Sequence, residues 1–151
     1  MTLRNLHDAS GAIGRSVRAW VATALNLEPD LILLGGDLVD HFAPDDVTPL
    51  LEQLSRLRAP LGVFSVRGNH DYRRFGDEVT DIEDDLAAIG IVTFANRGVV
   101  VRDDLDLAGV DDSNRGHARI DEALAARPVS LACLLMSHDP DVLPRVPPRS
   151  T

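Results

Sequence analysis

Hydrophobic residues follow two different periods along the chain, and segments of the two kinds alternate. In "RSVRAWVATALNL" (15–27) the apolar positions lie three and four residues apart, which is the spacing of one helix face. The short run "LILL" (31–34) is continuously apolar, as expected of a strand covered on both faces, and "LGVFSV" (61–66) is predicted to be the next strand. Apolar residues within 44–57 return to helical spacing. This alternation predicts an α/β fold with largely parallel strands.

The second half of the chain continues the alternation. In order, the pattern predicts a helix over 78–89, strands over 91–95, 99–102 and 105–110, a helix over 118–126, a strand over 129–136 and a helical turn over 139–146. No repeat, low-complexity tract or linker divides the sequence. We therefore expect residues 1–151 to form a single domain, which the chain length also favours.

Charge and composition exclude several classes of protein. The chain has 15 basic and 24 acidic residues and a net charge of −9, which argues against non-specific nucleic-acid binding. A phosphate-bearing substrate stays compatible, because bound divalent cations can reverse the local field. Cys133 is the single cysteine, so no intrachain disulfide can form. No apolar run approaches the roughly 18 residues of a membrane span, and "MTLRNLHDAS" lacks the apolar core of a signal peptide. We expect a cytoplasmic protein.

Polar side chains follow three of the predicted strands. They are Asp37 after the strand at 31–34, Asn69, His70 and Asp71 after the strand at 61–66, and His138 after the strand at 129–136. Ligands of α/β folds bind beyond the carboxyl ends of the strands, so these side chains are expected at one edge of the sheet. Carboxylate, amide and imidazole groups bind ions such as Mn²⁺, Fe²⁺ and Zn²⁺. Two such ions about 3.5–4 Å apart can clamp a phosphoryl group and supply a hydroxide.

Four motifs in this order resemble those of one family. "GGDLVDH" (35–41), "RGNHDY" (67–72), "LAGVDD" (107–112) and "LMSHDPDVL" (135–143) are similar to motifs of the calcineurin-like metallophosphoesterases. The likeness is strongest to the bacterial branch that carries GDLVD, GNHDY and SHxPD. It implies a layered α/β/β/α sandwich and a two-metal site that hydrolyses phosphate mono- or diesters.

The resemblance also implies a role for each matching residue. Asp37 would bridge two metal ions, and Asn69 and His138 would bind the second of them. His70 would stabilise the transition state or protonate the leaving oxygen, with Asp71 orienting its imidazole. The expected cofactors are two divalent ions, Mn²⁺ first and Fe or Zn next. The expected substrate is a phosphorylated small molecule, a nucleotide or a lipid-linked phosphate. Asp111 and Asp112 resemble loop residues rather than ligands.

The sequence departs from the family pattern at both ends. The family opens on Asp-x-His, where this chain has Asn5 and His7, and a carboxamide binds a divalent ion less strongly than a carboxylate. The later Gly-His-x-His motif is absent. The sandwich is therefore expected to be incomplete, with one metal retained as an alternative to two. Two interpretations stay open: a working enzyme, with missing groups supplied by a partner such as a second copy in a homodimer, or an impaired member acting as a binding or regulatory module or a non-functional fragment.

Overall fold

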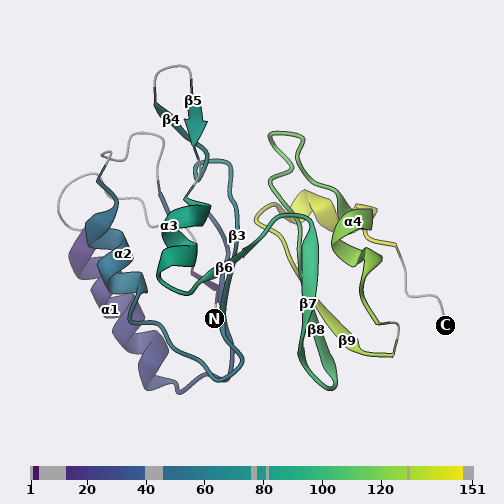
Figure 1. Cartoon of the computed structure of the whole chain (residues 1–151), viewed down its shortest axis with the longest axis horizontal. Coiled ribbons are helices and arrows are strands. Elements are labelled where there is room, and N and C mark those ends of the chain that lie inside the picture. The colour runs from purple at the N-terminus through teal and green to yellow at the C-terminus, as the bar shows by residue number, and fades with distance from the viewer. Residues whose placement is uncertain are drawn as a thin grey trace.

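The fold has four layers, in the order helices, sheet, sheet, helices. The computed structural model describes residues 2–3, 13–39, 46–75, 78–80, 82–128 and 130–147. Figure 1 shows α1, α2 and α3 on the outer face of the first sheet, and α4 on the outer face of the second. The two sheets face each other in the middle of the molecule.

The first sheet is parallel and carries three helices on its outer face. Its strands, in spatial order, are β1 (Thr2–Leu3), β2 (Ile32–Leu34), β3 (Val63–Val66) and β6 (Val92–Phe94). The helices are α1 (Ile13–Asn26), α2 (Thr48–Leu54) and α3 (Glu83–Ala88). All four residues of β3 are buried, which agrees with a strand covered on both faces.

The second sheet has three strands and mixed direction. β7 (Arg97–Arg102) pairs antiparallel with β8 (Leu105–Gly109), and β8 pairs parallel with β9 (Ala132–Met136). The parallel pair is connected through α4 (Ile120–Ala125). A 3₁₀ helix, η1 (Pro140–Arg145), follows β9 and begins with the side chain of Asp139 accepting the Asp141 N–H at 2.9 Å.

Three hydrophobic cores hold the four layers together. The first lies between α1, α2, α3 and the first sheet, and includes Val21, Leu34, Leu54 and Leu86. The second lies between the sheets and consists of Phe64, Val66, Phe94, Leu107 and Met136. The third joins the second sheet to α4 and η1 and consists of Val110, Ala118, Ile120, Ala123 and Val142. One core at each boundary confirms the predicted α/β/β/α layering.

The structure corrects one predicted element. The helix predicted over 78–89 begins only at Glu83, and β5 (Glu78–Thr80) instead pairs antiparallel with β4 (Arg73–Phe75). Val79 and Thr80 are β-branched and favour a strand once a partner is available. That partner is β4, which directly precedes β5 in the sequence, and the helical spacing of the apolar residues did not indicate it.

Within the described ranges, no helix has the length and apolar character needed to cross a membrane.

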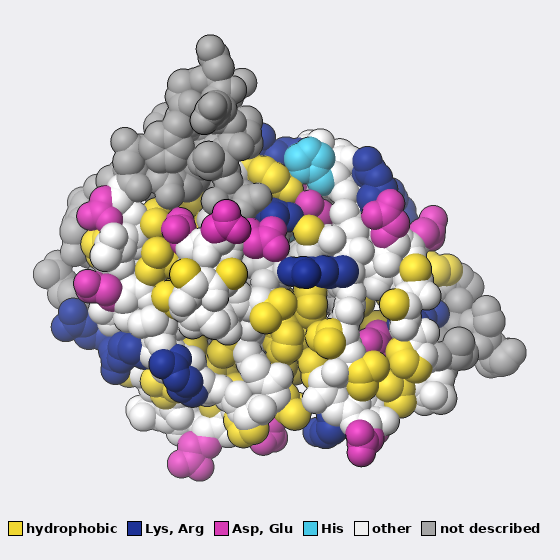
Figure 2. Space-filling view, viewed as in Figure 1, with side chains coloured by type: hydrophobic (Ala, Val, Ile, Leu, Met, Phe, Trp, Pro, Cys, Tyr) yellow, Lys and Arg dark blue, Asp and Glu magenta, His cyan; other side chains and the backbone are white. Residues whose placement is uncertain are grey.

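An apolar groove opens between the two sheets, away from the strand ends that carry the polar motifs. It has a volume of about 460 Å³, and its lining includes Leu61, Phe64, Val92, Val99 and Val100. Hydrophobic side chains reach the surface in the middle of the view in Figure 2. Leu61 and Val92 lie at the N-terminal ends of β3 and β6, whereas Asp37 and Asn69 follow the carboxyl ends of β2 and β3. The groove is therefore separate from the candidate site described next.

Candidate functional site

Asp37 lies where the loops after β2 and β3 come into close contact. A Cβ added to Gly36 would lie 2.5 Å from the Gly68 nitrogen, and one added to Gly68 would lie 2.1 Å from Asp37 Oδ1. Only glycine leaves room for this approach. Asp37 itself has φ of 53°, a left-handed conformation that costs a non-glycine residue on the order of 1–2 kcal/mol. The two loops thus hold a buried carboxylate in a strained position, as is common at functional sites.

The carboxylate of Asp71 holds the loops after β2 and β3 together. It is 1% exposed. One oxygen accepts the N–H groups of Leu38 at 2.7 Å and Val39 at 3.2 Å, and the other accepts those of Asp37 and Gly68, both at 2.8 Å. Burial raises the pKa of Asp71 to about 6, and the N–H donors oppose that rise. Among the described residues, all four hydrogen-bond donors to the Asp71 carboxylate are backbone N–H groups. The observed role of Asp71 is therefore to join the two loops, and its predicted contact with the His70 ring stays a prediction.

His138 reaches Asp37 from the second sheet. Its Nε2 lies 3.3 Å from Asp37 Oδ2, and its Nδ1 lies 2.8 Å from the Gly35 carbonyl oxygen. The hydrogen bond to Asp37 raises the pKa of His138 to about 9, against the opposing effect of burial. Burial alone would raise the pKa of Asp37, but the hydrogen bonds from His138 and the His70 N–H outweigh it and lower that pKa. At neutral pH the pair is therefore ionic.

The structure brings five of the predicted site residues together: Asp37, Asn69, His70, Asp71 and His138. His70 donates its backbone N–H to Asp37 Oδ1 at 3.0 Å, and Asn69 lies between His70 and Gly68. These groups come from the ends of two facing sheets rather than from one sheet edge, because β9 belongs to the second sheet. Asn5 and His7 lie outside the described residues. Among the described residues, no cluster of three His, Cys, Asp or Glu side chains forms a metal site.

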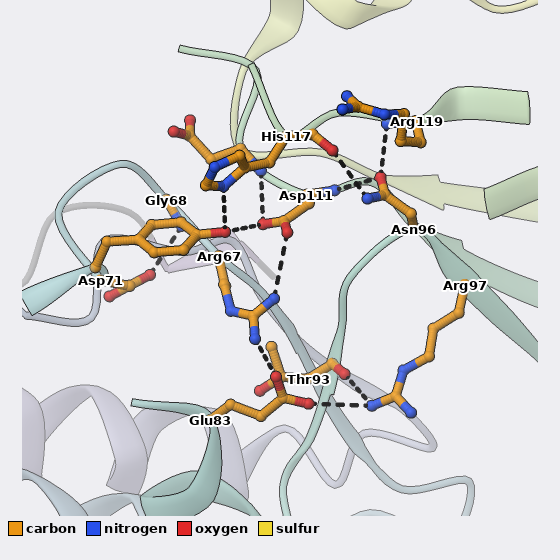
Figure 3. A network of polar contacts seen from close by, with 12 residues as sticks. Arg67, Gly68, Asp71, Glu83, Thr93, Asn96, Arg97, Asp111, His117 and Arg119 are labelled. Atoms are coloured by element: carbon orange, nitrogen blue, oxygen red, sulfur yellow. Dashed lines mark hydrogen bonds and ion pairs between the residues drawn. The ribbon is translucent and has the colours of Figure 1, made fainter. Parts of the chain in front are cut away.

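A second polar network, missed by the sequence analysis, joins the end of β3 to the end of β8. Arg67 is buried and binds both Glu83 and Asp111, the latter at 3.3 Å. Tyr72 donates its hydroxyl proton to Asp111 at 2.6 Å. Figure 3 shows Arg67, Asp111 and His117 converging between the two sheets. Tyr72 and Arg67 precede Asp111 by 39 and 44 residues in the sequence, so no local pattern could indicate these contacts.

The network ends on an exposed loop that borders Asn69. His117 Nδ1 lies 2.9 Å from the Tyr72 hydroxyl oxygen, and donates to it because Tyr72 gives its own proton to Asp111. Burial and the Asp111 hydrogen bond raise the pKa of Tyr72, so the phenol stays neutral. Two residues earlier, Arg115 donates its Nε–H to the Asn69 carbonyl oxygen at 3.1 Å. This loop forms one side of the candidate site.

The ion pair between His138 and Asp37 predicts a pH-dependent stability of the metal-free chain. Because the folded-state pKa of His138, about 9, lies above the ordinary value of 6.5, its contribution is complete below about pH 6.5 and disappears as the pH rises through 9. We expect the free energy of unfolding in EDTA to fall by on the order of 3 kcal/mol between pH 6 and pH 10, relative to His138→Gln. Urea titrations of both proteins measure this; parallel pH profiles would contradict it.

Comparison with known proteins agrees with the motifs. Residues 7–143 match the family described as calcineurin-like phosphoesterase. The chain is 29% identical over 132 residues to the uncharacterized metallophosphoesterase YkuE of Bacillus subtilis, covering 80% of this chain and 43% of YkuE. It is 31% identical over 125 residues to the phosphodiesterase YaeI of Escherichia coli, covering 80% of this chain and 45% of YaeI. An uncharacterized metallophosphoesterase of Campylobacter jejuni is 29% identical over 129 residues, covering 78% of this chain and 32% of that protein.

These matches, with their identities and coverages, establish the family but not the whole protein's function. The chain spans less than half the length of each of these relatives. The family match nevertheless covers most of the 151 residues and includes all four motifs from Asp37 to His138. The chain belongs to the calcineurin-like phosphoesterase family.

Proposed function

We propose that the protein is a metal-dependent phosphoesterase that hydrolyses phosphate mono- or diesters. The observation that carries this proposal is the Asp37–His138 pair, which the fold assembles from two facing sheets beside the Asn69–His70 loop. Family membership supports the reaction class. The name of the relative YaeI, a phosphodiesterase, favours a diester among the substrates.

The residues present fit a divalent cation. Asp37 and His138 offer an oxygen and a nitrogen that point toward each other across 3.3 Å. The same surroundings already stabilise a positive charge, since the pKa of His138 is raised to about 9 by its partner. A divalent ion bound here would replace that proton. A pair of such ions would polarise a phosphoryl group and lower the pKa of water.

Each proposed role is the one that the family resemblance implies for the matching residue. Asp37 would bridge the ions, and Asn69 and His138 would complete the second metal site. His7, with Asn5 where the family has an aspartate, would contribute to the first. His70, whose backbone N–H donates to Asp37 Oδ1, would give a proton to the leaving oxygen, as the family resemblance implies. Asp71 keeps the two loops in register.

The remaining details stay predictions from the sequence. They are Mn²⁺ as the metal, a phosphorylated small molecule, nucleotide or lipid-linked phosphate as the substrate, a homodimer, and a cytoplasmic location. An impaired member that acts as a binding or regulatory module is the competing function. The observation that favours this alternative is Asn5, which stands where the family has an aspartate, because a carboxamide binds a divalent ion less strongly than a carboxylate.

Counting metal ions separates the two functions. The chain is stripped with a chelator, reloaded with Mn²⁺ and desalted, and its metal content is measured by mass spectrometry. We expect at least one ion per chain, and hydrolysis of bis-p-nitrophenyl phosphate or p-nitrophenyl phosphate only in the reloaded sample. A reloaded chain without bound metal would contradict the proposal and favour the binding module. Hydrolysis that persists in EDTA would contradict the metal-dependent mechanism.

A further inference from the structure

This inference rests on the proposed phosphoesterase function and concerns recognition of the substrate. We propose that Arg115 binds a non-bridging oxygen of the substrate phosphate at the rim of the site. Its Nε–H donates to the backbone oxygen of Asn69 at 3.1 Å, which places the guanidinium beside a proposed metal ligand. The guanidinium carbon lies 5.2 Å from the centre of the Tyr72 ring. Arg115 is thus held at the site by two separate contacts although it is exposed.

The loop that carries Arg115 is held in place from within. Asp112, which is 1% exposed, accepts the backbone N–H of Arg115 at 2.9 Å and that of Asn114 at 3.2 Å. The backbone N–H of His117 donates to the Asp112 carbonyl oxygen at 3.0 Å and closes the turn. Fixing a long exposed side chain costs conformational entropy. A loop built to hold an arginine in one place therefore suggests a positioned charge rather than a solvated one.

The donors of Arg115 are suited to a phosphate. A guanidinium has five N–H groups, and the Asn69 contact uses the one on Nε. For the other four, no hydrogen bond is recorded within the part of the chain that the structure describes. Their planar arrangement matches two oxygens of a phosphate.

The electrostatic surroundings favour a further positive charge beside the proposed metal ions. The chain carries −9, and the buried carboxylates of Asp37, Asp71 and Asp112 lie at or next to the site. A phosphate ester approaching these groups is repelled unless cations compensate. Arg67 does not serve this purpose, because it is buried in ion pairs with Glu83 and Asp111. Arg115 presents its charge at the surface beside Asn69.

The test measures binding of inorganic phosphate to the Mn²⁺-loaded full chain by isothermal titration calorimetry. Losing a charge-assisted contact should weaken phosphate binding about 10- to 100-fold in Arg115→Ala. Arg115→Lys should recover part of the loss, because the charge is kept and the planar fork is not. Arg119→Ala is the matched control: its guanidinium donates to the Gly116 and Ala118 carbonyl oxygens of the same loop. It should leave phosphate affinity within about twofold of wild type.

Metal content and thermal stability keep this proposal separate from the proposed function. Arg115→Ala should bind as many Mn²⁺ ions as wild type, with a similar melting temperature. Wild-type chain that holds Mn²⁺ and binds phosphate no better than Arg115→Ala overturns the role of Arg115 and leaves the metal site standing. Loss of Mn²⁺ in Arg115→Ala also overturns it, because Arg115 would then act by holding Asn69. Wild-type chain that takes up no Mn²⁺ instead rejects the proposed function.

Discussion

Asp37→Asn is expected to eliminate Mn²⁺ binding and phosphoesterase activity while leaving the chain folded. The substitution keeps the shape of a buried side chain that lies in contact with Gly68 and His138. It removes the negative charge that a divalent ion requires, and it also removes the ion pair with His138. Loss of an outer partner of a metal ligand already costs about 10- to 100-fold in metal affinity, so loss of a bridging ligand should cost at least that much.

The measurement combines a Mn²⁺ titration with the rate of diester hydrolysis. We expect the rate to fall by roughly 10³-fold or to background, because metal activation of water is lost together with the ion. Asp106→Asn is the matched control: Asp106 is a buried aspartate, 3% exposed, on β8 within the second sheet. It should retain wild-type metal content and rate. Asp37→Asn with full metal content and full rate would reject Asp37 as a ligand.

The layered fold was predictable because each core-facing element carries its own signal. The strand predicted at 61–66 became β3, whose four residues are all buried, and the helical spacing within 15–27 became α1. The local part of the candidate site was also predictable, since Gly36 and Gly68 precede Asp37 and Asn69 in sequence. The close contact between the two loops explains why both positions are glycine, because no Cβ fits between the loops.

The rest depended on contacts between residues far apart in sequence. His138 Nδ1 meets the Gly35 carbonyl across 103 positions, and it does so from a different sheet than predicted. Whether a loop aspartate binds a metal, orients a histidine or accepts backbone N–H groups depends on where other loops lie. For Asp71 the recorded contacts are of the last kind. The position of Arg115 next to Asn69 likewise arises only when the ends of β3 and β8 face each other.

Asp71→Ala is expected to cause the largest loss of stability at the site. The substitution leaves four backbone N–H groups near the strand ends without their acceptor. Each buried, unsatisfied donor costs about 1–3 kcal/mol, but water entering the vacated space recovers part of that. A net loss of about 3–5 kcal/mol in the free energy of unfolding is therefore expected, a large fraction of the 5–15 kcal/mol typical of a domain. Urea denaturation in EDTA measures it without interference from metal.

Asp71→Asn distinguishes bracing of the loops from orientation of His70. Asparagine keeps one oxygen for two of the four donors and turns an NH₂ group toward the other two, so we expect an intermediate loss of about 2 kcal/mol. Asp104→Asn, which alters an exposed ion pair with Arg102, should change stability by less than about 1 kcal/mol. Unchanged stability in Asp71→Asn with a shifted pH profile of hydrolysis would favour the His70 role. Reduced stability with weaker Mn²⁺ binding would show that Asp71 shapes the metal site by holding the backbone of Asp37 and Gly68 together.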